Sequence, residues 1–332
     1  MQKELNRRGA AVRKNRGLAD ILLTPEVGII IPLIILVIFT AVSNPKFIYL
    51  ANISSILRYT AFIGVLAIGQ AVVIMSGEID LSVGANAGFS GIIFGLMVAR
   101  LGLSPIPAIL AAIASGMLIG FINGYLVAKF GLVNFITTLA TMFICRGLQV
   151  TFSDGRPVFP FPDYYSDFAV ERPLSLSWLF FIMLGILVIT EIIIRFTTIG
   201  RKVQAVGGNK EAALMGGINV SKVKWGAYIF SGAMAAVTGI LWALDMAAAN
   251  HDAGMGAEFR TITACAVGGI SLAGGSGSIL GVGLGVLLLQ VLQNALQVLK
   301  AESNLQLLII GLILIGAVTI DILRKNIKTK SA

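Results

Sequence analysis

Four amide side chains recur at helical spacing inside one apolar segment of the chain: Gln290, Gln293, Asn294 and Gln297. On a helix this spacing puts them on one stripe, and a polar stripe in a membrane faces either a partner helix or water. Amides suit a sugar, because each offers a donor and an acceptor without the cost of burying a charge. Hydrogen bonding between helices would satisfy the same groups, so both interpretations stay open.

Other polar residues in or beside apolar runs are candidates for the same solute pathway. They are Gln70, Asn86, Asn123 and Ser271. Glu78 and Asp80 lie at the end of an apolar run, where a carboxylate can cap the following helix; a gate on the pathway is the alternative. Asp245 and Arg146 either pair with each other or extend toward the membrane interface.

Motifs of common enzymes are missing from the sequence. There is no GxxxxGK[ST] loop for a nucleotide, no HExxH metal motif and no GxSxG nucleophile elbow. His251 is the single histidine, and a metal site needs several convergent ligands. We therefore expect no catalytic, cofactor-binding or metal-binding residue on this chain.

The composition indicates that membrane helices position these residues. Of 332 residues, 57% are hydrophobic and 12% are charged, and the mean hydropathy is +0.91. Apolar runs recur at about 20 residues, the length that spans a bilayer. We predict an all-α polytopic membrane protein with about ten transmembrane helices, in one transmembrane domain over residues 27–323. The predicted spans are 27–43, 56–76, 84–100, 106–128, 133–152, 175–195, 225–248, 259–272, 278–298 and 304–322.

Glycine adds detail to this prediction. The span at 259–272 is short for a full crossing, so it is expected to be broken or re-entrant. A weak internal repeat relates residues 79–84 to residues 270–275, each next to a Gly-rich run. With 38 glycines, several in GxxxG spacing, the helices are expected to pack closely.

The positive charge predicts the orientation. Most of the 25 lysines and arginines fall in three places: the N-terminal segment 1–26, the polar segment 195–224 and the tail 324–332. By the positive-inside rule these segments and both termini are cytoplasmic, and the acidic loop 153–174 is outside. The net charge of +9 is thus explained by membrane orientation, and no nucleic-acid partner is expected.

Segment 195–224 is the place where the chain must meet something soluble. Residues 211–215 favour a helix, which Gly216 and Gly217 can end. A short helix held between two spans, with Leu214 and Met215 beside charged residues, could dock in a groove of a partner.

The same segment resembles a known family. Its runs Gly200-Arg201, 205–209, 211–213 and 217–220 are similar to the coupling loop of bacterial ATP-binding-cassette (ABC) permeases for monosaccharides, the ribose permease family. Residues 76–84, 119–124 and 253–277 resemble the family as well. Permeases for a quorum-signal furanose and for branched-chain amino acids are similar at lower specificity.

The resemblance implies a set of partners and a coupling site. The partners are cytoplasmic ATPases that bind the ATP, a second permease subunit in a homo- or heterodimer, an extracytoplasmic solute-binding protein and the membrane lipid. The distal Leu-Pro of many importer permeases is replaced here by Val223-Lys224, which leaves the length of the coupling helix open. The implied coupling residues are Arg201, Gly207, Gly208, Asn209, Glu211, Ala212, Ala213, Leu214, Gly217 and Ile218.

Our prediction is a permease subunit, in the bacterial inner membrane, of an ATP-driven, binding-protein-dependent importer for a sugar or small polyol. A secondary carrier is the main alternative, although such carriers usually need an ionisable residue at the membrane midplane, and the centres of these spans hold almost no acids. A membrane enzyme lacks a convergent catalytic set. The predicted docking residues for the binding protein are Asp154, Asp163, Asp167, Glu171, Asp252 and Glu258.

Overall fold

The chain forms an all-helical membrane bundle in the residues that the structure describes. The computed structural model describes residues 25–162, 165, 176–301 and, in the last apolar run, 308–309, 311–313, 315–316 and 319. Seven helices there are long and apolar enough to cross a membrane, and a shorter apolar helix, Gly28–Ser43, precedes them. The predicted all-α polytopic fold is therefore confirmed.

The helices follow the predicted spans closely. Nearly all of the predicted segment 1–26, most of the span 304–322 and the tail 324–332 lie outside the described residues. The described elements are α3 (Pro25–Ser43), η1 (Pro45–Ile48), α4 (Leu50–Met75), α5 (Val83–Gly95), the π-helical turn η2 (Leu96–Arg100), α6 (Pro105–Ala128), α7 (Asn134–Ser153), α9 (Trp178–Phe196), α10 (Thr198–Gly208), α11 (Lys210–Met215), α12 (Val220–Asp245), α13 (Ala257–Val267) and α14 (Ile279–Val298).

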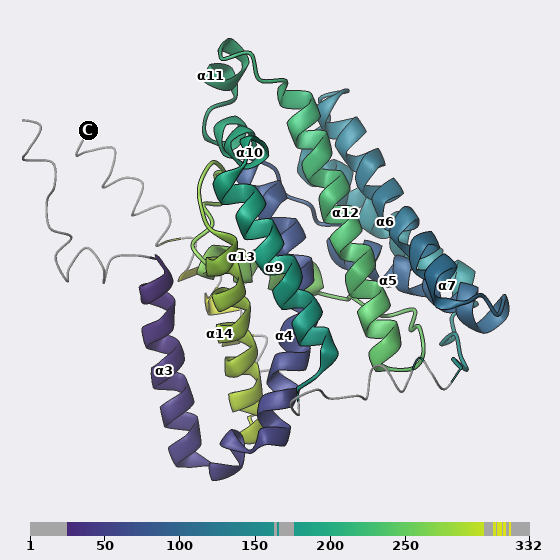
Figure 1. The fold of residues 1–332 in the computed structure, drawn as a ribbon, viewed down its shortest axis with the longest axis vertical. Helices are drawn as coiled ribbons and strands as arrows, with labels where there is room; N and C mark the ends of the chain where they lie inside the picture. Colours follow the sequence, from purple (N-terminus) through teal and green to yellow (C-terminus); the bar gives the residue numbers. More distant parts are fainter. Residues whose placement is uncertain are drawn as a thin grey trace, which may run out of the picture.

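The two ends of the bundle differ. Helices α10 and α11 lie at one end, at the top of Figure 1, and we call this the α10–α11 end. The turn η1 lies at the opposite end, where Asn44 Nδ2 donates to the carbonyl of Val298 at 3.3 Å, so α3 and α14 finish together. Helices α9 and α12 run between the two ends, and α4 lies among them as part of the core (Figure 1).

Helix α12 packs on α6 at backbone distance. A Cβ added to Gly120 would lie 2.2 Å from the carbonyl oxygen of Tyr228, and one added to Gly116 would lie 2.5 Å from that of Gly232. Glycine is therefore required at these contacts, since any side chain would collide with the neighbouring backbone. The GxxxG spacing in this part of the sequence thus corresponds to a close helix crossing.

Two irregular loops join helices near the α10–α11 end of the bundle. Helix α4 ends at Met75 and α5 begins at Val83, and the intervening residues 76–82 form an irregular loop, loop 76–82. Helix α13 has 11 residues and is about 16 Å long, too short to cross a membrane. Loop 268–278 then leads into α14. The broken element expected at 259–272 is therefore present, and its loop lies at the end of the bundle that carries α10.

Candidate functional site

A cavity of about 420 Å³ lies in the half of the bundle away from α10 and α11. Its walls come from α4, α12, α13, α14 and the loop after α12, and we call it the amide-lined cavity. Sites for small molecules usually have volumes of about 300–1,000 Å³. The cavity can therefore hold a small solute.

The amide stripe of α14 divides between this cavity and a helix contact. Gln290, Gln293 and Gln297 line the cavity. Asn294 is buried instead and exchanges two side-chain hydrogen bonds of 2.9 Å with Asn52 of α4. The helix-contact interpretation thus holds for Asn294, and a role of the three glutamines in the solute pathway stays a prediction.

Aromatic and charged side chains complete the walls. Tyr59 and Phe62 of α4 lie edge to face at 6.0 Å between ring centroids, and Phe62 is 6.3 Å from Trp242 of α12. Asp252 and Arg260 also line the cavity. Amide donors and acceptors beside apolar aromatic surface can bind a polyhydroxylated molecule, whose hydroxyl and C–H groups need both.

The sequence did not point to most of these walls. Tyr59, Phe62, Trp242 and Arg260 are ordinary residues within their own segments. They become a site only because α4, α12 and α13 meet in the fold, and no spacing along the chain reports that meeting.

Two of the other predicted pathway residues, Asp80 and Asn123, belong to a buried hydrogen-bond network. Asp80 Oδ1 accepts from the backbone N–H of Ser82 at 2.8 Å and from its hydroxyl at 2.6 Å, at the start of α5. Asn123 Nδ2 donates to the Ser82 hydroxyl at 2.9 Å, and its oxygen accepts from Thr141 at 2.6 Å. Asp80 therefore binds the N-cap residue of α5, Ser82, and does not itself cap the helix. The network holds α5, α6 and α7 together.

Gln70, Asn86 and Ser271 are buried as well. The amide of Gln70 lies against the backbone of Asp80, with its nitrogen 3.1 Å from the carbonyl oxygen and its oxygen 3.3 Å from the nitrogen. Asn86 Nδ2 donates to the carbonyl of Gly116 at 3.1 Å. The Ser271 hydroxyl has no hydrogen-bond partner among the described residues. None of these three lines the amide-lined cavity.

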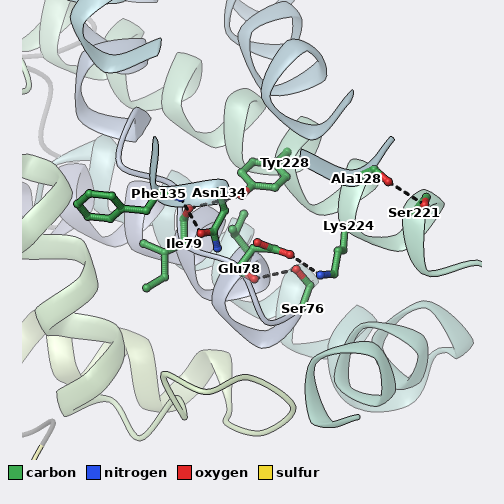
Figure 2. Close-up of polar contacts among 10 residues, drawn as sticks. Ser76, Glu78, Ile79, Ala128, Asn134, Phe135, Ser221, Lys224 and Tyr228 are labelled. Carbon is green, nitrogen blue, oxygen red and sulfur yellow. Dashed lines mark hydrogen bonds and ion pairs between the residues drawn. The ribbon is translucent and has the colours of Figure 1, made fainter. Parts of the chain in front are cut away.

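Glu78 forms an ion pair rather than a helix cap. Its carboxylate contacts Lys224 Nζ at the start of α12, and the two side chains are 9% and 15% exposed (Figure 2). The hydroxyl of Tyr228, one turn further along α12, donates to the carbonyl of Ile79 at 3.4 Å. Loop 76–82 is therefore fixed to α12 by charge and by a hydrogen bond, close to the α10–α11 end.

The predicted coupling segment contains two helices, one of them unpredicted. Helix α11 is capped at its N-terminus by Asn209, whose side chain accepts from the N–H of Ala212 at 2.9 Å, and at its C-terminus by Gly216. Ala213 packs into a small core with Val206 and Val220. The outward residues are exposed, Leu214 by 52% and Met215 by 91%, while Glu211 and Ala212 are also exposed. The segment before Asn209, with the exposed Arg201, forms α10.

Helix α10 lies in close backbone contact with loop 268–278 and with the end of α4 that leads into loop 76–82. The N–H of Gly275 donates to the carbonyl of Met75 at 3.0 Å. A Cβ on Gly207 would lie 1.9 Å from that same carbonyl oxygen and 2.7 Å from the nitrogen of Gly275. Gly274, with φ of +89°, approaches Gly77 and Gly207 in the same place. We call this contact of α10, loop 76–82 and loop 268–278 the glycine junction, and it unites the two halves of the weak sequence repeat.

The predicted docking residues have different surroundings. Asp154 is exposed and pairs with Arg100 at 2.9 Å. Asp252 lines the amide-lined cavity. Glu258 is 5% exposed, so in this conformation it does not offer the docking surface that its place after an outside loop suggested. The remaining three, Asp163, Asp167 and Glu171, lie outside the described residues.

Arg146 and Asp245 do not pair with each other. Arg146 donates to the carbonyls of Ala253 and Gly254 at 2.7 Å each, and so holds the loop beside the cavity. Asp245 pairs with Arg58 at 3.0 Å. Arg146 and Asp245 have different partners because α7 packs beside the loop after α12, whereas the end of α12 lies beside Arg58 of α4.

Comparison with known proteins identifies the family. A family model described as the permease component of branched-chain amino acid transport systems matches residues 52–318. The chain belongs to this permease family. It is 33% identical to the ribose import permease protein RbsC of Escherichia coli K12 over 88% of this chain and 92% of the relative. It is 36% identical to RbsC of Bacillus subtilis, over 89% and 92%.

Another relative is named for a different sugar, L-arabinose. The chain is 32% identical to the L-arabinose ABC transporter permease protein AraH of Azospirillum brasilense, over 90% of this chain and 88% of the relative. No solved structure matches the chain significantly. The resemblance to ribose-permease-like ABC importers is confirmed: the protein is a multi-pass permease subunit of the bacterial inner membrane, a transport component and not an enzyme.

Proposed function

We propose that this chain forms the membrane pathway of an ATP-driven, binding-protein-dependent importer for a small neutral sugar or polyol. The observation that carries the proposal is the amide-lined cavity, where Gln290, Gln293 and Gln297 face a space bordered by aromatic rings. Relatives named as ribose and L-arabinose permeases support a sugar. The pathway needs uncharged hydrogen-bonding groups so that solute can bind and then leave, which amides supply.

The cytoplasmic ATPase is proposed to dock on α11. Leu214 and Met215 project from this helix into solvent, which leaves apolar surface available for a groove on a partner. Because α11 follows α10 directly, a movement of α11 would be transmitted through α10 to the glycine junction. That movement would shift loop 76–82 and loop 268–278, which lead into α5 and α14.

The Glu78–Lys224 pair is proposed to hold the inner gate. It joins loop 76–82 to α12 near the α10–α11 end, whereas the amide-lined cavity lies in the other half of the bundle. The described conformation therefore fits a solute pathway that is closed on the cytoplasmic side. Movement of α10 would separate the pair and open that side.

On the outside, a solute-binding protein would meet the loops beside the cavity. Asp154 and Asp252 are the described acidic residues of this surface, and the predicted loop 153–174 would add Asp163, Asp167 and Glu171. A second permease chain, identical or related, would complete the transporter.

A branched-chain amino acid is the second candidate solute. Asp252 and Arg260 both line the cavity and could pair with an ammonium and a carboxylate group. The family model's description agrees with this solute, while the named relatives agree with a sugar.

Uptake into proteoliposomes would test the proposal. The chain is reconstituted with its candidate ATPase and binding protein, and the uptake of radiolabelled ribose, L-arabinose and L-leucine is measured with and without ATP. ATP-dependent uptake of a sugar is expected. Uptake that persists without ATP and follows a proton or sodium gradient would show a secondary carrier, and ATP-driven uptake of leucine alone would favour the amino acid.

A further inference from the structure

A second groove, of about 390 Å³, lies near the α10–α11 end between α9, α10 and α12. Apolar side chains form most of its walls, among them Ile193, Val203, Val223 and Phe230. We call it the α9–α12 groove. It is separate from the amide-lined cavity: α12 borders the groove at Gly226 and the cavity at Trp242, about 24 Å apart along the helix.

The groove is continuous with a surface that faces lipid. On α9 and the start of α10, Ile189, Ile192, Phe196 and Ile199 are between 50% and 67% exposed, as expected for side chains in contact with hydrocarbon. Gly226 leaves the groove open, because a Cβ added there would meet no atom within 4 Å. An acyl chain would therefore find open space beside Gly226.

Two lysines stand at the edge of this apolar space. Lys202 of α10 and Lys222 of α12 both line the groove and are exposed. The four ion pairs found among the described residues involve neither of them. An apolar groove with two ammonium groups at its edge, near the ends of membrane-spanning helices, matches the two parts of an anionic phospholipid.

We propose that the α9–α12 groove binds an anionic phospholipid, with an acyl chain along the apolar wall and the phosphate between Lys202 and Lys222. A bound lipid would fill the space between α12 and the helices α9 and α10. The charge complementarity favours a lipid over another apolar helix, which would leave both ammonium groups without a counter-ion. The proposal does not depend on which solute is transported.

Lipid binding to the purified full-length chain would test this. The protein is incubated with equal amounts of phosphatidylglycerol and phosphatidylcholine carrying the same acyl chains, and bound lipids are counted by native mass spectrometry. The wild type is expected to retain phosphatidylglycerol preferentially. Lys202→Gln and Lys222→Gln should each weaken that preference about five-fold, as expected for one basic residue at an anionic membrane surface. Gly226→Leu, which fills the groove, should release one bound lipid of either kind.

A matched control separates this site from general surface charge. The double variant Lys129→Gln with Lys210→Gln removes two exposed lysines that do not line the groove. An equal loss of phosphatidylglycerol in this control would overturn the proposal. Wild-type lipid binding by Gly226→Leu would do the same. So would an unchanged lipid count with altered subunit association in Gly226→Leu, since it would indicate a protein partner in the groove.

Discussion

Amide side chains in the spans have two roles that depend on their neighbours. Asn294 and Asn52 satisfy each other across a helix contact, whereas Gln290 forms no hydrogen bond with the described residues and faces the cavity. The first role contributes to stability and the second leaves groups available to a solute. Amide side chains thus join two helices or face the cavity according to which helix lies opposite.

Replacing Gln290 with leucine should reduce transport and leave the fold intact. The solute would lose a hydrogen bond worth about 0.5–1.5 kcal/mol, which lowers uptake at limiting solute by roughly 2- to 12-fold. Proteoliposome uptake and the thermal unfolding midpoint are measured together. Asn294→Leu is the control: it removes both hydrogen bonds to Asn52, whose amide keeps only its bond to the carbonyl of Phe47, and it should lower the unfolding midpoint while uptake per folded transporter is kept. Equal uptake losses in the two variants would contradict these roles.

Breaking the Glu78–Lys224 pair should be costly, because it leaves a buried charge. Lys224→Met alone is expected to lower the free energy of unfolding by about 3–5 kcal/mol. The double variant Glu78→Gln with Lys224→Met removes both charges and should recover most of that loss. Denaturation of the four forms in a double-mutant cycle measures the coupling between the two side chains. Additive effects would mean that the pair contributes nothing.

Among the helices, the long spans were predictable and the coupling region was only partly so. An apolar run of membrane length can satisfy its backbone groups in lipid only as a helix, so α4, α6, α12 and α14 followed from the sequence. Helix α10 did not, because its short, mixed sequence does not reach that length. Asn209 gave a local signal, since it caps α11 in the way that its residue type favours.

The candidate site was less predictable than the helices. Spacing along α14 revealed Gln290, Gln293 and Gln297 because all three lie on one element. Lys224 and Glu78 are 146 residues apart in sequence, and their contact depends on the path of the whole chain. The aromatic residues of the amide-lined cavity could not be predicted for the same reason, since they come from helices that are far apart in sequence.

The glycine junction makes a sharp prediction for α10. Gly207→Ala should uncouple ATP hydrolysis from transport, because its Cβ would lie 1.9 Å from the carbonyl oxygen of Met75 and force α10 away from loop 76–82. Gly208→Ala is the matched control, since its nearest neighbour would be 3.8 Å away. ATPase rate and solute uptake are measured on the same proteoliposomes. Tight coupling in Gly207→Ala, or equal uncoupling in both variants, would remove the junction from the mechanism.

At the scale of the whole molecule, the α10–α11 end lies opposite the half of the bundle that contains the amide-lined cavity. We expect the α10–α11 end to be cytoplasmic. The two cysteines of the chain, Cys145 and Cys265, are buried and should not react with a soluble maleimide, so the native chain offers a low background for labelling.

Cysteine labelling in intact cells would test the orientation. A cysteine at Asp154 should react with a membrane-impermeant maleimide, because that residue is exposed and is expected outside. A cysteine at Met215, which is 91% exposed, should react only after the cells are permeabilised. The unsubstituted chain serves as the control, and the reverse labelling pattern would invert the proposed topology.

Helix α12 runs between these ends as one continuous helix. It carries Lys224 near one end and Trp242 near the other, and its 26 residues extend about 39 Å. Its backbone is closest to α6 between these ends, at Tyr228 and Gly232. A rocking of about 10° around its middle would shift the two ends by about 3 Å in opposite directions. The motion that separates Lys224 from Glu78 would then at the same time move Trp242 in the opposite direction and change the shape of the amide-lined cavity.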